Sequence, residues 1–258
     1  MIKLIACDLD GTLMQNGATK PDDELFPLID ALEEKGILFV AASGRQYACM
    51  QKLFAPVKDR IAYICENGAL CMYRDKIISE TYIERNLGKF MLESIREKEN
   101  CEILLSGKNV SYLESKDSEY IDLIENVVGN NTCIVPDTTE VTEPFYKISV
   151  CNMSGIDDSY DYFRDTFSNL ANVVTSGNIW LDMMDQNCNK GNALSILCEY
   201  LGISSEECAA FGDHYNDVEM LKFAGHSYAM ENAQPGIPKL CKYSCSRVED
   251  TLREMIGG

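Results

Sequence analysis

Apolar runs at both ends of the chain predict a parallel sheet covered by helices. The first run, residues 2–7, is almost continuously apolar and is followed by acidic residues and glycine, as in a buried parallel strand that enters an active-site loop. A leucine and isoleucine repeat at 25–32 has helical spacing and precedes a second apolar run at 37–42. A helix at 47–54 and a third run at 61–65 complete a predicted β-α-β-α-β alternation.

This alternation stops after the third run and resumes at Lys190. Residues 69–73 and 76–82 predict a hairpin. The next segment predicts strands at 101–106, 110–114, 145–151 and 179–184 and helices near 87–98, 118–128 and 158–170. The final segment predicts helices at 190–200, 217–223 and 248–256 and strands at 208–211 and 226–230.

We therefore expect an α/β fold made of two parts. Residues 1–82 and 187–258 would form a core around a parallel sheet, and residues 83–186 would form an inserted α+β domain with antiparallel pairs. The length of 258 residues is near the size at which a single hydrophobic core stops growing, which agrees with two unequal domains.

Composition limits the partners that the protein can have. The formal net charge is −18 and the 23 Lys and Arg residues form no basic run, so nucleic acid is not expected as a partner. No apolar window is long enough to predict a membrane span. Twelve scattered cysteines, without a C-x-x-C pair or an apolar signal segment before the first strand, favour reduced thiols in the cytoplasm.

Two acidic residues follow the first predicted strand. Asp8 and Asp10 are two positions apart, so their side chains point to the same side of an extended chain, at the edge of the sheet where ligands bind. Two carboxylates held this close repel each other, and Mg²⁺ would relieve that repulsion. One of them could also be a nucleophile that forms an aspartyl-phosphate, while the other moves protons. The alternative is an Asp-Gly surface turn.

Two later strand-to-helix junctions predict phosphate binding. Ser43, Gly44 and Arg45 follow the second strand and offer a hydroxyl, a backbone amide and a cation, although a Ser-Gly pair can also be a simple helix cap. Lys190 is a cation at the start of a helix, where the dipole disfavours it, so an anionic neighbour is expected. It would neutralise both a nucleophile and a transferred phosphoryl group, and the alternative is a solvated surface lysine.

A fourth polar loop, residues 212–217, follows the strand at 208–211. Asp213 would supply a direct or water-mediated metal ligand, Asp217 would support it, and Asn216 could donate to phosphate or to the nucleophile. A helix cap by Asn216 or Asp217 is the alternative.

These segments, in this order, resemble the motifs of the haloacid dehalogenase-like phosphatases, and the large insertion resembles that of the Cof-type branch. The motifs are Asp8-Leu9-Asp10-Gly11-Thr12-Leu13, Ser43-Gly44-Arg45, Lys190-Gly191 and Gly212-Asp213-x-x-Asn216-Asp217, and the similarity covers nearly the whole chain. The resemblance implies a Rossmann-like core with an α/β cap that closes over a small phosphorylated metabolite, in a monomer or weak homodimer.

The resemblance also implies a role for each matching residue. Asp8 would be nucleophile and metal ligand, and Asp10 would be the acid and base and would bind Mg²⁺ through its backbone carbonyl. The remaining roles are phosphate binding by Ser43, Gly44, Lys190 and Asn216, metal ligation by Asp213 with Asp217 orienting it, and substrate contacts by Arg45 and Asn67.

Three positions depart from the family pattern. Asp185 and Asn187 replace a common Pro and Gly before the lysine, and because Asn tolerates a left-handed backbone the turn can survive. Glu231 replaces a common Gly and adds negative charge near the expected rim of the site.

Three functions agree with the sequence. The leading hypothesis is hydrolysis of a sugar phosphate or a phosphorylated cofactor. A sugar phosphomutase would share the nucleophile but shield the phospho-enzyme from water. A regulatory module phosphorylated on Asp8 would need neither Asp10 nor the insertion.

Overall fold

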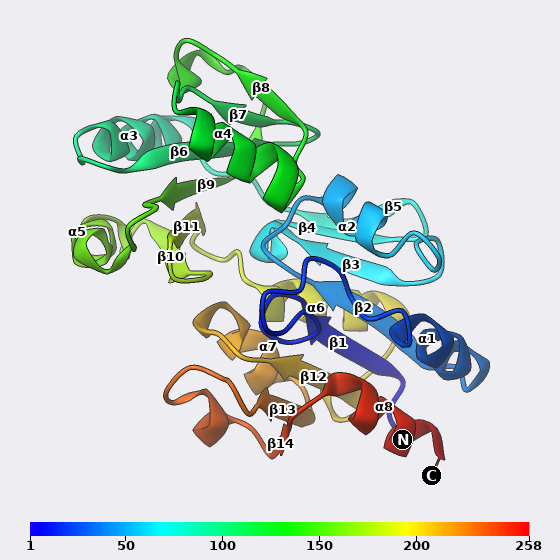
Figure 1. Ribbon diagram of the computed structural model, residues 1–258. Helices are drawn as coiled ribbons and strands as arrows, with labels where there is room; N and C mark the ends of the chain where they lie inside the picture. Colours follow the sequence, from blue (N-terminus) through cyan, green and yellow to red (C-terminus); the bar gives the residue numbers. More distant parts are fainter. Residues whose placement is uncertain (258) are drawn as a thin grey trace. The chain divides into compact units, whose positions relative to one another are not determined.

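The chain divides into two compact units in the computed structural model, which describes residues 1–257 and, for Asp158, only the backbone. The first unit comprises Met1–Glu80 and the chain from Asn189 onward, and the second comprises Thr81–Cys188 (Figure 1). Gly258, the last residue of the predicted core, lies outside the described residues.

The first unit contains an eight-stranded sheet with the order β14-β13-β12-β1-β2-β3-β4-β5. The strands from β14 to β3 are parallel, whereas β3, β4 and β5 pair antiparallel as the predicted hairpin does. The bounds are β1 (Leu4–Asp8), β2 (Leu38–Ala42), β3 (Ala62–Cys65), β4 (Leu70–Tyr73), β5 (Lys76–Glu80), β12 (Cys208–Gly212), β13 (His226–Met230) and β14 (Tyr243–Cys245).

Helices complete the core of this unit. They are α1 (Leu25–Glu34), α2 (Tyr47–Leu53), α6 (Lys190–Leu201), α7 (Val218–Phe223) and α8 (Val248–Gly257). Leu194 and Leu197 of α6 and Leu221 of α7 pack against small residues of the central strands, such as Ala6 and Ala210, in one buried cluster. Small residues on the strands let these helices lie close to the sheet.

The central position of β1 determines where the functional residues meet. β1 pairs with β2 so that Asp8 lies opposite Ala42, and with β12 so that Cys7 lies opposite Phe211. The loops that leave β1, β2 and β12 therefore begin at the same edge of the sheet, which is where parallel α/β sheets bind ligands.

The second unit is built on a six-stranded sheet with the order β10-β11-β9-β6-β7-β8. Its strands pair antiparallel, except for β7 and β8, which are parallel. The strands are β6 (Glu102–Gly107), β7 (Ser111–Leu113), β8 (Thr132–Ile134), β9 (Phe145–Cys151), β10 (Ala171–Thr175) and β11 (Trp180–Asp185). The helices are α3 (Arg85–Arg96), α4 (Ser118–Asp122), continued by a π-helix at Leu123–Val128, and α5 (Asp157–Phe167).

Two buried clusters stabilise this unit. The larger one joins side chains of α3 and α5, such as Leu92 and Phe163, to Ile148 and other residues of the sheet. The smaller one joins Tyr120 and Ile124 of the α4 segment to sheet residues that include Leu104. The unit therefore has a hydrophobic core of its own.

The fold class expected from the sequence is confirmed, with local differences. Short strands β8, β10 and β14 were not predicted, and the predicted helix at 118–128 is an α-helix followed by a π-helix. Every helix within residues 1–257 is too short or too polar to cross a membrane.

Truncating the core of the second unit should cost stability. Leu92 is 1% exposed, so Leu92→Ala should lower the free energy of unfolding by about 2–5 kcal/mol through lost burial and a residual cavity. Leu170→Ala, at a leucine that is 49% exposed, is the matched control and should cost less than about 1 kcal/mol. Urea unfolding followed by circular dichroism measures both, and equal losses would show that the α3 face is not part of the core.

Candidate active site

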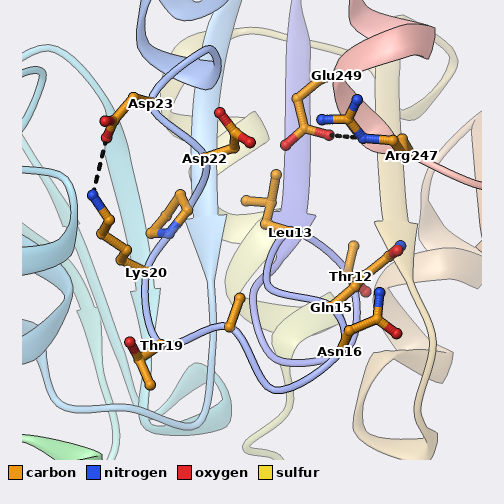
Figure 2. A pocket seen from close by; sticks show the side chains of 12 residues that line it. Thr12, Leu13, Gln15, Asn16, Thr19, Lys20, Asp22, Asp23, Arg247 and Glu249 are labelled. Atoms are coloured by element: carbon orange, nitrogen blue, oxygen red, sulfur yellow. Dashed lines mark hydrogen bonds and ion pairs between the residues drawn. The ribbon is translucent and has the colours of Figure 1, made fainter.

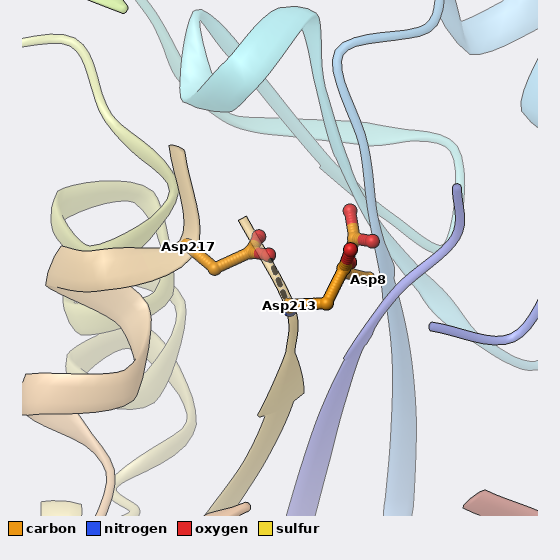
Figure 3. A group of neighbouring side chains, drawn as sticks. All are labelled: Asp8, Asp213 and Asp217. Atoms are coloured by element: carbon orange, nitrogen blue, oxygen red, sulfur yellow. Dashed lines mark hydrogen bonds between the residues drawn. The ribbon is translucent and has the colours of Figure 1, made fainter. Parts of the chain in front are cut away.

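Three aspartates meet at the carboxyl-terminal edge of the first unit's sheet. Asp8 ends β1, Asp213 directly follows β12, and Asp217 ends the short 3₁₀ turn at Tyr215–Asp217. One carboxylate oxygen from each aspartate lies within 4.8 Å of the other two, and all three residues are buried (Figure 3). The first and fourth motifs of the sequence therefore form one site.

Lys190 connects this group of aspartates to helix α6. Its side chain is 0% exposed, and Nζ lies 2.5 Å from Asp8 Oδ1 and 2.7 Å from Asp217 Oδ1. The carboxylates of Asp8 and Asp217 thus take the place of the water molecules that would hydrate an exposed lysine at the start of a helix. The alternative of a solvated surface lysine is wrong.

Asp217 fixes the position of its neighbours. Its Oδ2 accepts hydrogen bonds from the backbone N–H groups of Asp213 at 3.0 Å and of His214 at 3.1 Å, while Oδ1 binds Lys190. Both oxygens therefore have protein donors. Asp217 caps the turn, and the same hydrogen bonds leave the expected role in orienting Asp213 open to it.

Thr12 has a contact that the sequence analysis did not predict. Its Oγ1 donates a hydrogen bond of 2.9 Å to Asp213 Oδ1, and Asn232 donates one of 2.9 Å to the carbonyl of Gly11. Gly11 has a φ of 93°, and a Cβ there would overlap the Asp213 carboxylate. In the sequence, the only indication of these contacts was that Gly11 and Thr12 belong to the same loop as Asp8 and Asp10.

Asp10 lies apart from the three buried aspartates. Its side chain is 50% exposed, and Arg45 binds it with two hydrogen bonds, Nε to Oδ2 at 2.9 Å and Nη2 to Oδ1 at 2.6 Å. The structure therefore joins the first and second motifs through this bidentate pair, whereas the sequence suggested a contact of Arg45 with the substrate.

The other predicted phosphate and substrate residues cluster around Asn67. Asn216 Nδ2 donates to Asn67 Oδ1 at 3.0 Å, and a Cβ on Gly44 would lie 3.1 Å from the same oxygen. Ser43 is buried, and its Oγ accepts the backbone N–H of Arg45 at 3.2 Å. Because the N-cap residue of α2 is Gln46, the alternative of Ser43 as a simple helix cap is wrong.

Charge and burial shift the acidity of this group. Burial and the nearby Asp217 raise the pKa of Asp8 well above its usual value, even though Lys190 opposes the shift. The same two causes raise the pKa of Asp213 to about 6, against the hydrogen bond from Thr12. Burial would lower the pKa of Lys190, but Asp217 and Asp8 outweigh it and raise this pKa. The site holds more negative charge than the ammonium balances.

A hard divalent cation fits this donor set. Three carboxylates and one ammonium leave two uncompensated negative charges in a buried place, and carboxylate oxygens are the ligands that Mg²⁺ prefers. Asp8 and Asp213 are the better candidates for direct ligation, since Lys190 and two backbone amides already bind Asp217.

The residues that depart from the family pattern lie in turns after strands β11 and β13. Asp185 ends β11, and its Oδ1 accepts the backbone N–H of Asn187 at 3.0 Å, which supports the turn without Pro or Gly. Glu231 directly follows β13, is exposed, and donates its backbone N–H to the carbonyl of Cys245 at 3.0 Å.

Comparisons with known proteins identify the family of the chain. A family model described as haloacid dehalogenase-like hydrolase matches residues 5–251. The chain is 28% identical over 244 residues to 5-amino-6-(5-phospho-D-ribitylamino)uracil phosphatase of Escherichia coli. This alignment covers 94% of this chain and 90% of the relative. The chain is 26% identical to HMP-PP phosphatase of an Enterobacter species, over 91% of this chain and 86% of the relative.

A solved structure has the same architecture. The crystal structure of SMU.1108c from Streptococcus mutans superposes with a TM-score of 0.91 at 26% identity and covers 100% of both chains. The match of the family model over nearly the whole chain agrees with the order of the motifs and the inserted unit. The chain belongs to the haloacid dehalogenase-like hydrolases and is one of the phosphatases of that family.

Proposed function

We propose that the protein hydrolyses phosphomonoesters of small metabolites through an aspartyl-phosphate on Asp8, with Mg²⁺ as cofactor. The observation that supports this most is the buried group of Asp8, Asp213 and Asp217 around the single ammonium of Lys190. Such a group concentrates positive charge at a phosphoryl group once a divalent cation balances the carboxylates.

The cation would be held by oxygen ligands of the first unit. Asp8 and Asp213 would bind it with their carboxylates, and Asp10 would bind it with its backbone carbonyl. When bound, Mg²⁺ supplies charge neutralisation for the phosphoryl oxygens. Asp217 would keep Asp213 and Lys190 in position through the hydrogen bonds that it accepts from both.

The reaction would proceed in two steps at Asp8. A carboxylate oxygen of Asp8 attacks phosphorus, the bond from phosphorus to the ester oxygen breaks, and Asp10 gives its proton to the leaving oxygen. Asp10 then takes a proton from a water molecule, which attacks phosphorus and releases inorganic phosphate and the free carboxylate. Asp10 suits this role because half of its side chain is open to solvent.

The phosphoryl group would be bound by groups from three loops. Ser43, Gly44 and Asn216 would donate from a hydroxyl, a backbone amide and a side-chain amide, and Lys190 would supply charge. Asn67 would position Asn216 through their hydrogen bond, on the side where the substrate enters.

The inserted domain, residues 83–186, would select the substrate as a cap that excludes water. Two relatives are named for a phosphorylated ribitylaminouracil and for HMP-PP, so a sugar-like or heterocyclic phosphorylated metabolite is the class that we propose. The reaction would take place in the cytoplasm, in a monomer or weak homodimer.

Removing the nucleophile should abolish turnover. Asp8→Asn should lower phosphate release by at least about a thousandfold in the presence of Mg²⁺, because an amide does not attack phosphorus. The fold should survive, since Lys190 keeps its ion pair with Asp217 and the lost charge relieves the repulsion between Asp8 and Asp217. Phosphate release from sugar phosphates, pyridoxal phosphate and flavin mononucleotide, with Mg²⁺ or chelator, measures the effect.

The control for this variant is Asp23→Asn, at an exposed aspartate on the loop after β1, which should retain full activity. Near-normal release by Asp8→Asn would exclude the assigned nucleophile. No release by the wild type, together with a persistent phospho-enzyme, would favour a mutase or a regulatory module instead.

Loss of the bidentate pair should slow the proton-transfer steps. Arg45→Gln should lower kcat by about 10- to 100-fold with a smaller change in KM, because Asp10 loses the group that orients it. Arg60→Gln removes an arginine that also binds two carboxylates, Asp30 and Glu33, and should leave kcat unchanged. An increase in KM alone would indicate that Arg45 binds substrate and does not orient Asp10.

Chelation should expose a pH dependence of stability. The pKa of Asp213 is raised to about 6 in the folded protein, so its protonation favours the fold at low pH, and this contribution is lost as the pH rises through 6. With EDTA, the Tm of the wild type relative to Asp213→Asn should therefore fall between pH 4 and pH 7, as measured by calorimetry. Adding Mg²⁺ should raise the wild-type Tm more at pH 7 than at pH 5. Parallel Tm profiles for the two proteins would contradict this account.

A further inference from the structure

Charged groups in the pocket beside the loop that follows β1 pair with each other (Figure 2). Lys20 Nζ lies 3.4 Å from Asp23 Oδ1, and Arg247 Nε lies 3.8 Å from Glu249 Oε2. These charges of the pocket wall therefore have partners within the chain. The second unit, by contrast, contains a buried polar cluster to which the proposed chemistry assigns no role, and one of its side chains has no partner.

The two faces of the second unit's sheet differ in polarity. Side chains alternate between the faces along a strand. On β9, Ile148 and Val150 belong to the apolar cluster that includes side chains of α3 and α5. Lys147 and Ser149 lie on the opposite face and are nevertheless buried. Polar side chains in such a place need hydrogen-bond partners.

The register of three strands places four polar side chains on this face. Ser106 of β6 lies opposite Lys147 of β9, and Ser149 of β9 lies opposite Asp182 of β11. Residues directly opposite each other on antiparallel strands point to the same side of the sheet. None of the four is more than 4% exposed. We call Ser106, Lys147, Ser149 and Asp182 the polar face.

An ion pair occupies part of the polar face. Lys147 Nζ lies 3.6 Å from Asp182 Oδ2. The hydroxyl of Ser149 donates to Asp182 Oδ1 at 2.5 Å, and that of Ser176 donates to Oδ2 at 2.7 Å, so both carboxylate oxygens are held in place. Among the described side chains of this unit, Lys147 and Asp182 are the two charged ones that are buried. Because desolvation of a buried pair offsets its attraction, stability alone is a weak reason for placing charges here.

Ser106 is the residue of the polar face that points to a ligand. Its Oγ is buried, and no atom in the described part of the chain forms a hydrogen bond with it. A buried hydroxyl without a partner costs free energy, because it loses the hydrogen bonds that water provides. An alanine would occupy the same strand position without this cost. A ligand that bonds to the hydroxyl would remove the cost, and the register puts that hydroxyl beside Lys147.

We propose that the polar face binds the hydroxyl groups of a polyol, a carbon chain with adjacent hydroxyls. Each hydroxyl of such a ligand both donates and accepts. Ser106 and Lys147 would donate to it, and the carboxylate of Asp182 would accept from it. Lys147 and Asp182 offset each other's charge, so a neutral group suits this site better than an ion. The site is buried, and a ligand reaches such a site while the segments that cover it open.

Phosphate release tests whether the polyol is the organic part of a phosphorylated substrate, a case that rests on the proposed function. The full chain with Mg²⁺ should hydrolyse ribitol 5-phosphate with a kcat/KM at least about tenfold above that for pentyl phosphate. Pentyl phosphate has the same number of carbons and lacks the hydroxyls, so the ratio of the two values isolates recognition of the hydroxyl groups.

Ligand-observed NMR tests whether the polyol is a free molecule, a case that is independent of the proposed function. Saturation transfer from the full chain should detect binding of ribitol at about 10 mM, which covers dissociation constants in the millimolar range. Pentane-1,5-diol, which has no adjacent hydroxyls, should give a weaker signal.

Ser106→Ala should weaken recognition without weakening the fold. Ribitol affinity, or the preference for the ribitol ester, should fall about twofold to tenfold, as expected for one lost neutral hydrogen bond. The Tm should not fall, because the removed hydroxyl has no partner in the folded protein. Ser168→Ala, at an exposed serine of the same unit, is the matched control and should behave as the wild type does. If Ser106→Ala does not fold, Ser176→Ala, which removes a donor to Asp182, replaces it and should weaken recognition too.

The outcomes separate this inference from the proposed function. Ester preference that falls in Ser106→Ala identifies the polyol as part of the substrate, and ribitol binding without ester preference identifies a free polyol. Ribitol binding together with no hydrolysis of either ester would contradict the proposed hydrolysis and leave the polar face as a polyol site. The inference is overturned if ribitol neither binds nor improves its ester, or if Ser106→Ala and Ser168→Ala recognise ribitol equally well.

Discussion

The ammonium of Lys190 is the group on which the arrangement of the first unit depends. A fully buried lysine is tolerated only when carboxylates surround it, and here Asp8 and Asp217 do so from separate parts of the chain. Strand β1, helix α6 and the turn after β12 must therefore converge within hydrogen-bond distance of one nitrogen. A displacement of any one of them would leave a buried charge without its partner.

Close approach of backbones makes this convergence possible. Gly11 leaves room for the Asp213 carboxylate, and Gly68 leaves room for the backbone carbonyl of Asn189 just before Lys190. Both glycines have positive φ, so a side chain would be strained at either position as well as too large. The polar loops are held by packing of the main chain as much as by their own hydrogen bonds.

The sequence predicted the parts of the fold that depend on strong local patterns. Continuous apolar runs identified the central strands, and their ends placed the polar motifs at one edge of a sheet. The three-residue strands β8 and β14 lack such a run, since they are largely exposed and short, and the half-buried β10 carries no clear alternation. The pairing of Arg45 with Asp10 and of Thr12 with Asp213 arises from tertiary contacts between loops, which spacing along the chain does not encode.

The position of β1 between β2 and β12 has a consequence for biosynthesis. Leu4 pairs with Leu38 and also with Cys208, so one neighbour of this strand is made early and the other only after the whole inserted unit has left the ribosome. The inserted unit has its own core and can fold while the sheet of the first unit is still open on one side. Until β12 has been made, one edge of β1 has no partner strand, and an unpaired strand edge is prone to pair with other chains.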